Sequence, residues 1–290
     1  MPVDLQALAS KMRVLDGAWG TALHERGLAP GVPPEMWNTE NAEVVAQLAE
    51  EYIQAGCDLL TANTFGTNRY VLAGHGRGER SAELAAAGVR LSRAAAGEVP
   101  VVASIGPTGR VMMMGDLPAA DLTAAYGEVI RAVADAGADA LVFESFSEME
   151  ELTLAVTAAK DACDLPMVLS MTFGCGASGT TTVMGNTPEQ LAAFACEVGA
   201  AAVGANCGAG PDVALHITRH LQKASDLPIW IKPNAGLPQI RAGRTIYPME
   251  PDTFAEYVPE FAAGGVSFFG GCCGTTPAHV RAVRAAVDAL

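Results

Sequence analysis

The feature of this sequence that most constrains its fold is a repeated alternation of short apolar runs and longer helical patterns. The short runs are rich in β-branched and other apolar residues, which is typical of buried parallel strands. The stretches between them are rich in alanine and carry spaced apolar positions, which favours helix. We predict eight strands, at residues 14–18, 59–64, 101–105, 140–144, 167–171, 202–206, 229–232 and 266–269. The clearest helical stretches are 41–55, 122–136, 188–198 and 253–263.

Glycine recurs just before several predicted strands, where a helix has to end. Examples are Ala-Gly-Cys-Asp at 55–58, Ala-Gly-Ala-Asp at 136–139, Val-Gly-Ala-Ala at 198–201 and Gly-Gly-Val-Ser at 264–267. A glycine at such a position adopts the left-handed conformation that closes a helix. The pattern predicts an α/β fold, a single-domain (β/α)8 TIM barrel over residues 1–290, with its active site at the carboxyl ends of the strands. A doubly wound open sheet is the alternative.

Composition narrows the function classes. The chain of 290 residues is 50% hydrophobic, enough for one large core. Lys and Arg together number 18 against 32 Asp and Glu, a formal charge of −14, which argues against nucleic acid or an anionic membrane as a partner. No apolar segment approaches the roughly 18 residues that span a bilayer, and no signal peptide is recognisable at the start. We therefore expect a soluble, cytoplasmic protein.

Three cysteines stand at the ends of two predicted strands. Cys207 follows the sixth strand, and Cys272 and Cys273 follow the eighth within Gly-Gly-Cys-Cys-Gly-Thr-Thr-Pro. In a barrel these strands are separated by one strand, so the thiols are expected to meet over the mouth. Zinc with three protein ligands keeps its fourth position open, and a soft three-sulfur site suits a thiol substrate. The alternative is that all three are buried small apolar residues.

The remaining cysteines lack this setting. With an odd total of 7 and no export signal, they are expected to be free thiols in a reducing compartment. Cys57, Cys163 and Cys196 are predicted packing residues. Cys175 follows the fifth strand at the mouth, and its role is left open. The run 112–114 of three methionines, after the third strand, is predicted either to contact a bulky substrate or partner or to lie buried in its loop.

Polar residues follow other predicted strands. Asp16 and Glu144 can hold a cationic amino group by charge-assisted hydrogen bonds. The alternatives are a helix N-cap for Asp16 and a buried, hydrogen-bonded structural acid for Glu144. Backbone N–H groups of the 17–20 turn can bind a carboxylate. Further candidate substrate contacts at the mouth are Gly17, Ala18, Trp19, Asn63, Asn206 and Asn234.

The strand-end motifs together give the chain a family resemblance. They are Asp-Gly-Ala-Trp-Gly-Thr at 16–21, Thr-Ala-Asn-Thr-Phe-Gly-Thr-Asn-Arg at 61–69, Ile-Gly-Pro-Thr-Gly at 105–109, Phe-Glu-Ser-Phe at 143–146, Asn-Cys at 206–207, Pro-Asn-Ala-Gly at 233–236 and Gly-Gly-Cys-Cys-Gly-Thr-Thr-Pro-Ala-His-Val at 270–280. With these motifs the chain resembles the homocysteine S-methyltransferase family, and within it the homocysteine-binding barrel of cobalamin-dependent methionine synthase.

This resemblance implies a zinc-dependent homocysteine S-methyltransferase that forms methionine. It implies that Cys207, Cys272 and Cys273 are the zinc ligands, that Asp16 and Glu144 bind the amino group of homocysteine, and that the Ala18–Trp19 backbone contacts its carboxylate. Asn234 corresponds to a position where the family can offer a fourth zinc ligand before substrate arrives. A thiol on zinc is deprotonated at neutral pH and therefore becomes nucleophilic.

The resemblance leaves the methyl donor open. The folate and cobalamin modules of methionine synthase are absent from the sequence, so we expect methylcobalamin on a separate corrinoid protein, or a small donor such as S-methylmethionine or betaine. The loop 174–179 lacks the acidic residue usual in the family. That loop and the methionine run at 112–114 motivate an alternative, a corrinoid-linked demethylase. An alternative of another class is a non-catalytic zinc-binding or thiol-binding barrel.

Overall fold

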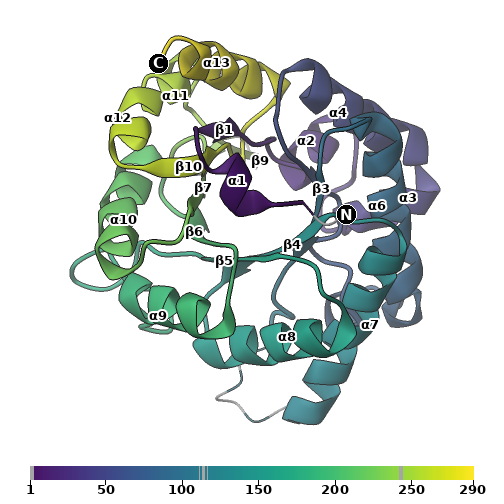
Figure 1. The fold of residues 1–290 in the computed structure, drawn as a ribbon. Helices are drawn as coiled ribbons and strands as arrows, with labels where there is room; N and C mark the ends of the chain where they lie inside the picture. Colours follow the sequence, from purple (N-terminus) through teal and green to yellow (C-terminus); the bar gives the residue numbers. More distant parts are fainter. Residues whose placement is uncertain (1–2, 111, 113–114, 116, 242–243) are drawn as a thin grey trace.

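The computed structural model describes residues 3–110, 112, 115, 117–241 and 244–290. Its centre is an eight-stranded sheet surrounded by helices (Figure 1). Neighbouring strands are parallel and follow the order β1-β10-β7-β6-β5-β4-β3-β2. A parallel bridge between Leu15 and Leu59 joins the two ends of this order, so the sheet closes on itself. The predicted (β/α)8 barrel is confirmed.

The strands lie where the apolar runs predicted them, with small differences at their ends. The first two are shorter than expected, at Arg13–Val14 and Leu60–Ala62. Three others extend further and have Phe146, Cys207 and Pro233 as their last residues. The barrel strands are β1 (Arg13–Val14), β2 (Leu60–Ala62), β3 (Val101–Ile105), β4 (Ala140–Phe146), β5 (Met167–Met171), β6 (Ala202–Cys207), β7 (Ile229–Pro233) and β10 (Val266–Phe269).

Helices cover the outside of the barrel, and several begin and end at the residues that favour this. Helix α9 starts with a capping box between Thr187 and Gln190 and ends at Gly199 in the left-handed conformation. The helices are α1 (Leu5–Leu8), α2 (Gly20–Glu25), α3 (Trp37–Glu40), α4 (Ala42–Gln54), α5 (Arg69–Ala73), α6 (Ser81–Ala96), α7 (Ala119–Asp135), α8 (Met149–Ala162), α9 (Pro188–Val198), α10 (Pro211–Ala224), α11 (Pro251–Ala255), α12 (Val258–Ala263) and α13 (Pro277–Asp288), with 3₁₀ turns η1 (Pro34–Met36) and η2 (Gly78–Arg80).

One helix prediction is wrong in detail. The stretch 253–263, expected to be continuous, is two helices, α11 and α12. Pro259 lies in the first turn of α12. Proline has no backbone N–H, and its ring clashes with the carbonyl four residues earlier, which here belongs to Ala255, the last residue of α11. The apolar spacing continues across this break, so periodicity alone did not reveal it.

Two apolar layers hold the barrel together. The larger lies between the strands and the outer helices. The smaller fills the barrel interior and includes Leu15, Leu59, Val102, Trp230 and Phe268, with Leu5 of α1 packed against them. The barrel is therefore a packed core rather than a pore.

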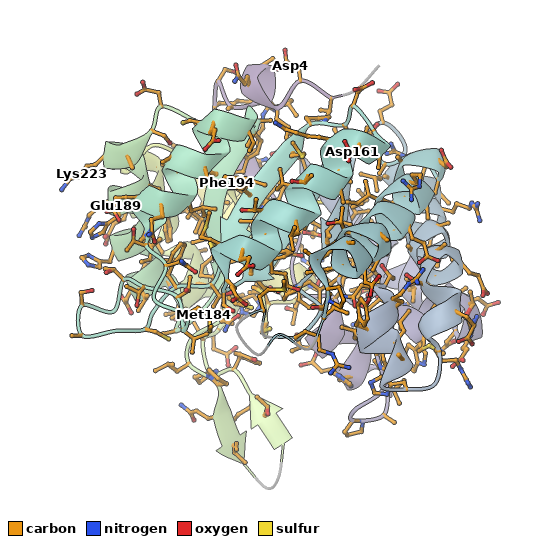
Figure 2. The ribbon with its side chains drawn as sticks, turned by 90° about the horizontal axis from the view of Figure 1, so that it is seen from below. Asp4, Asp161, Met184, Glu189, Phe194 and Lys223 are labelled. Carbon is orange, nitrogen blue, oxygen red and sulfur yellow. The ribbon has the colours of Figure 1, made fainter. Side chains whose placement is uncertain are left out.

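A β-hairpin extends from the barrel next to the site. Strands β8 (Gln239–Arg241) and β9 (Arg244–Ile246) pair in antiparallel fashion, and Figure 2 shows them projecting on the side opposite Asp4, which caps α1. The hairpin follows β7 and so borders the mouth of the barrel. In the described part of the chain, none of the helices is both long and apolar enough to cross a membrane.

Phe268→Ala is expected to destabilise the barrel strongly. The ring is fully buried and lies 5.4 Å from that of Trp230, centroid to centroid. Its removal leaves a cavity in the interior layer, at a cost of about 3–5 kcal/mol. Urea unfolding followed by circular dichroism measures this cost. Ile240→Ala, at a side chain 82% exposed in the hairpin, is the apolar control and should change stability by less than about 0.5 kcal/mol. Equal unfolding midpoints for both variants would contradict the described interior.

Candidate metal and substrate site

The structure brings the three strand-end cysteines together at the mouth. The Sγ atom of Cys207 lies 3.0 Å from that of Cys272 and 4.0 Å from that of Cys273, and the last two are 4.0 Å apart. All three side chains are half-buried. Among the described residues, they are the one group of three or more potential ligands close enough to share a metal ion. Sulfur atoms from segments 65 residues apart therefore converge as the barrel closes.

The end of β7 positions both cysteine-bearing segments. Cys207 is paired with Pro233 in the sheet, and the N–H of Cys272 donates a 2.8 Å hydrogen bond to the Pro233 carbonyl. The next residue, Asn234, connects the two segments again: its Nδ2 donates to the Gly208 carbonyl at 2.7 Å, and its Oδ1 accepts the Cys273 N–H at 3.0 Å. The Asn234 side chain thus fixes the spacing of the thiols.

The glycines around the cysteine pair are required by space. A Cβ on Gly271 would lie 2.3 Å from the Thr275 side chain, and one on Gly274 would lie 2.2 Å from that of Tyr247. Gly274 also has φ +83°, a region that L side chains rarely adopt. Thr275 in turn holds the Cys272 carbonyl by a 2.7 Å hydrogen bond from its Oγ1. Close packing therefore fixes the loop that carries Cys272 and Cys273.

Hydrogen bonds among the thiols change their pKa values in opposite directions. Hydrogen bonds from Cys207 and Cys272 lower the pKa of Cys273 to about 3, whereas its role as a donor in those bonds, together with burial, raises the pKa of Cys207. A cluster of three soft sulfur atoms has the donor set that zinc prefers. The residues present therefore fit this metal.

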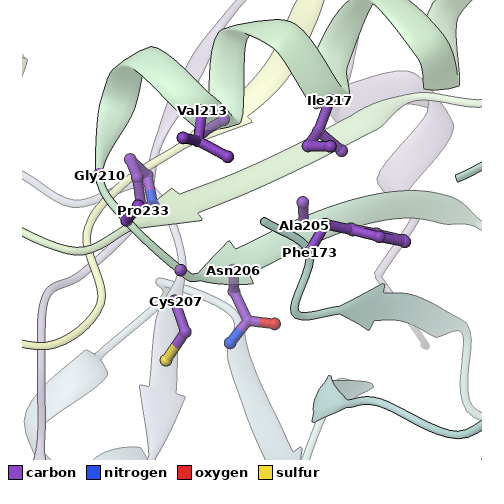
Figure 3. A pocket seen from close by; sticks show the side chains of 11 residues that line it. Phe173, Ala205, Asn206, Cys207, Gly210, Val213, Ile217 and Pro233 are labelled. Atoms are coloured by element: carbon purple, nitrogen blue, oxygen red, sulfur yellow. The ribbon is translucent and has the colours of Figure 1, made fainter. Parts of the chain in front are cut away.

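Behind the cysteines the barrel wall is apolar and closed. Figure 3 shows Cys207 and Asn206 at the end of β6, with their side chains directed away from Val213 and Ile217 of α10. The gap on the α10 side has a volume of only about 10 Å³, too small for a ligand. The reactive face of Cys207 is therefore the face toward the mouth.

A cavity of about 460 Å³ opens on that face. The three cysteines line it together with Glu144, Lys232 and Trp19. This volume lies within the range of small-molecule sites and exceeds what one short amino acid needs. The cavity lining thus combines soft metal ligands with charged groups.

Asp16 is fully buried next to the lining residues Trp19 and Lys232 and is hydrogen-bonded on both oxygens. Its Oδ1 accepts from Lys232 Nζ at 2.6 Å, and its Oδ2 accepts from the N–H and hydroxyl of Thr61 at 2.8 and 2.5 Å and from the Trp19 indole at 3.2 Å. Both members of the ion pair with Lys232 are buried. Asp16 therefore orients Lys232 and Trp19; a direct contact of Asp16 with substrate stays a prediction.

Glu144 faces the same cavity, and its negative charge is compensated by fewer neighbouring groups than that of Asp16. Its carboxylate accepts a hydrogen bond from the hydroxyl of Ser104. Burial raises the pKa of Glu144 to about 7, and the nearby Lys232 ammonium offsets part of that effect. A carboxylate in such a site gains free energy when a ligand brings a positive charge, so Glu144 is suited to an ammonium group.

The 17–20 turn forms another wall of the cavity. The Ala18 N–H donates to Thr275 Oγ1 at 3.1 Å, and the Ala18 carbonyl accepts from the Tyr52 hydroxyl at 2.6 Å. A Cβ on Gly17 would lie 2.9 Å from Tyr52, so only glycine fits there without displacement. The Trp19 indole also donates to Thr61 Oγ1 at 3.0 Å. The turn is rigidly held, and helix α2 begins at Gly20 without a side-chain cap.

Two predicted substrate contacts, Asn63 and Asn206, are bonded within the protein. The Asn63 amide donates to the Pro34 carbonyl at 2.9 Å and to Asn38 Oδ1 at 2.8 Å. Asn206 is bonded to Ser145 and Ser170. These amides anchor the loops that line the cavity, and their predicted contact with substrate stays a prediction.

Lys232, Ser104 and Ser145 line the cavity and were not predicted from the sequence. The available signal was a lysine within an otherwise apolar strand, Ile229–Pro233, because a buried charge needs a partner.

Cys175 and Met112 belong to the two loops whose roles were left open. Cys175 is exposed, and its N–H and carbonyl pair with Thr181 in a short turn. Met112 packs partly against the core, and its N–H donates to Glu148 at 3.0 Å, whereas Met113 and Met114 lie outside the described residues. None of these contacts reaches the cysteine cluster.

The chain is similar in sequence and in fold to known proteins. Residues 13–287 match the family described as Homocysteine S-methyltransferase. Methionine synthase of Mycobacterium leprae is 32% identical over 98% of this chain, and the chain spans about a quarter (25%) of that protein's length. The crystal structure of the oxidized form of homocysteine methyltransferase MmuM from Escherichia coli has a TM-score of 0.79 at 25% identity, covering 98% of this chain and 99% of that one. The metallated form of MmuM has a TM-score of 0.81 at 24% identity, with the same coverage.

The raised pKa of Glu144 predicts a pH-dependent stability. Between its unfolded pKa of 4.5 and its folded pKa of about 7, the folded state holds a proton that the unfolded state has released, so stability falls as pH rises through this window. Glu144→Gln should flatten that decline in urea unfolding at about pH 5 and about pH 8. The control is Glu98→Gln, at an exposed side chain. The stability of this variant should fall with rising pH as that of the wild type does. Parallel declines for the wild type and Glu144→Gln would show that Glu144 does not titrate as described.

Proposed function

The chain belongs to the homocysteine S-methyltransferase family, and on this basis we propose that it is a zinc-dependent enzyme that methylates homocysteine to methionine. The observation that carries the proposal is the convergence of Cys207, Cys272 and Cys273 within 4.8 Å of one another on the wall of an open cavity. Three thiolates leave the fourth zinc position for a thiol substrate.

The proposed division of roles follows from the charges in the cavity. Cys207, Cys272 and Cys273 would hold zinc, whose chemistry is to deprotonate a bound thiol at neutral pH. The Glu144 carboxylate receives the substrate ammonium, and the 17–20 turn lies beside the substrate carboxylate. Asp16 acts behind Glu144 by fixing Lys232 and Trp19. Asn234 keeps the thiols at the spacing that one metal ion requires.

The reaction itself needs little from the protein beyond this arrangement. The substrate sulfur forms a bond to the methyl carbon of the donor, and the donor leaves with the electron pair of its former bond to that carbon. The cavity orients sulfur and methyl carbon for this displacement, which is the main catalytic contribution that a rigid site makes. Protein thiolates around the metal leave the site with net negative charge, which keeps the substrate sulfur nucleophilic.

We propose that the methyl group comes from a methylcorrinoid on a separate protein or from a small sulfonium or ammonium donor. The similarity to methionine synthase motivates the first source, and the second is the alternative that the sequence leaves open. We also propose a reducing, cytoplasmic location, because each of the cysteines is a free thiol in the structure.

Cys273→Ala is expected to abolish both zinc retention and methionine formation. The change removes one of three metal ligands, and an incomplete site loses most of its affinity. Zinc content after gel filtration and methionine formed from homocysteine are the two measurements, with S-methylmethionine, betaine and a methylcobalamin carrier as donors. Cys196→Ser, at an exposed thiol of α9, is the matched control and should behave as wild type.

Two outcomes would contradict the proposed function. One is full methionine formation by zinc-free Cys273→Ala. The other is a wild-type protein that binds zinc but transfers no methyl group to homocysteine from any of these donors. In that case a corrinoid-linked demethylase or a non-catalytic barrel would be the remaining function.

Asn234→Ala is expected to weaken zinc binding without removing a protein thiol. The amide connects the segment after Cys207 to the N–H of Cys273, and loss of such a supporting contact typically costs about 10- to 100-fold in metal affinity. Competition with a chromophoric chelator measures this affinity. Asn38→Ala, which removes another buried amide remote from the thiols, should leave it unchanged. Equal zinc affinities for Asn234→Ala and wild type would exclude the positioning role.

A further inference from the structure

Two residues with unusual backbone conformations lie side by side next to the thiols. Ser145 has φ 63° and Cys207 has φ 59°, and among the described residues they are the only non-glycine residues with positive φ. The left-handed region costs an L-residue roughly 1–2 kcal/mol, so it persists only where the surroundings impose it. Their side chains are 3.8 Å apart, from Ser145 Oγ to Cys207 Sγ. The fold therefore maintains strain on both partners of this contact.

Asn206 holds this arrangement and fixes its direction. The Ser145 N–H can only donate, so the atom 2.9 Å from it must be the Asn206 Oδ1, which also accepts the Ser170 hydroxyl at 2.7 Å. The amide nitrogen then faces the Ser145 side chain, and Nδ2 donates to Ser145 Oγ at 2.7 Å. No flipped orientation of the amide satisfies the backbone N–H. The orientation of the Asn206 amide is thus set by the backbone.

The orientation of Asn206 leaves the Ser145 proton free to point elsewhere. Because Ser145 Oγ accepts from Asn206, its own O–H is available as a donor, and Cys207 Sγ is the acceptor within reach. We propose that, in the zinc-loaded protein, the Ser145 hydroxyl donates a hydrogen bond to the Cys207 thiolate and thereby lowers the nucleophilicity of that sulfur relative to the sulfur of the substrate. Ser145 is a positioning residue in this role, since it acts through Cys207.

This role addresses a selectivity problem created by the proposed zinc function, on which the inference rests. Several sulfur atoms would surround one metal ion, and each is able to attack an alkyl donor. In such an attack a sulfur lone pair forms the new S–C bond while the leaving group departs with the pair from the broken bond. A hydrogen bond to sulfur stabilises that lone pair, so the thiolate that accepts it reacts more slowly. The Ser145 hydroxyl therefore protects Cys207 from being alkylated in place of the substrate.

The test measures alkylation of individual cysteines in the zinc-loaded protein. Ser145→Ala removes the hydroxyl, and Ser145→Gly removes it while relieving the strain at positive φ. Each protein is treated with iodoacetamide, which loses iodide on attack by sulfur, and peptide mass spectrometry follows modification of Cys207 and Cys273 over time. Both variants should alkylate Cys207 roughly fivefold faster than wild type, about 1 kcal/mol of activation free energy, with the Cys273 rate unchanged.

Ser170→Ala is the matched control. It removes the other hydroxyl bonded to Asn206 Oδ1 but leaves Ser145 beside the sulfur, so its Cys207 rate should equal that of wild type. Equal acceleration of Cys207 and Cys273 in the Ser145 variants would indicate general loosening and overturn the proposal. An unchanged Cys207 rate would also overturn it.

Zinc content measured in the same samples separates this inference from the proposed function. Retained zinc with an unchanged Cys207 rate rejects only the hydroxyl role. A wild type that holds no zinc rejects both the zinc function and the hydroxyl role, because without the metal Cys207 keeps its proton.

Discussion

The end of β7 is the constraint on which the site depends. Pro233 pairs with Cys207 on one side and accepts the Cys272 N–H on the other, and Asn234 then connects the same two segments through its side-chain amide. Because parallel strands end at one rim of the barrel, this single strand end holds segments far apart in sequence at the spacing of one metal site. Cys207 lies in the sheet itself, and the loop that carries Cys272 and Cys273 is hydrogen-bonded to the end of a neighbouring strand.

The charged side of the cavity depends on a second buried contact, the ion pair between Asp16 and Lys232. A buried pair of this kind adds little net stability, because desolvation of both charges opposes their attraction. What it fixes is position: Asp16 gathers Lys232, Thr61 and Trp19 around one carboxylate. Glu144 remains as the carboxylate whose charge is least compensated, which is the property that recognition of an ammonium group requires.

Much of the fold was predictable because its signals are local. Apolar runs marked each strand, and the glycine at 199 ended α9 at the expected residue. The convergence of the cysteines followed from the predicted topology, since it needed only the order of strands around a barrel. The break between α11 and α12 was missed because Pro259 interrupts the backbone hydrogen bonds without disturbing the apolar spacing.

The finer features of the site were not predictable from the pattern. Lys232 gave one signal, a lysine in an otherwise apolar strand, but its partner lies 216 residues away in the sequence and no pattern pointed to it. Ser145 gave no signal, because its importance comes from a backbone conformation and from an amide on another strand. Such contacts form only when the barrel brings distant strands together, and periodicity and motif spacing do not predict which side chains then meet.

X-ray absorption at the zinc edge, measured on the zinc-loaded protein before and after addition of homocysteine, tests the central claim most directly. The account predicts three sulfur ligands from the protein and a fourth sulfur, at about 2.3 Å, when the substrate is added. A zinc ion whose sulfur count is unchanged by homocysteine would contradict the account.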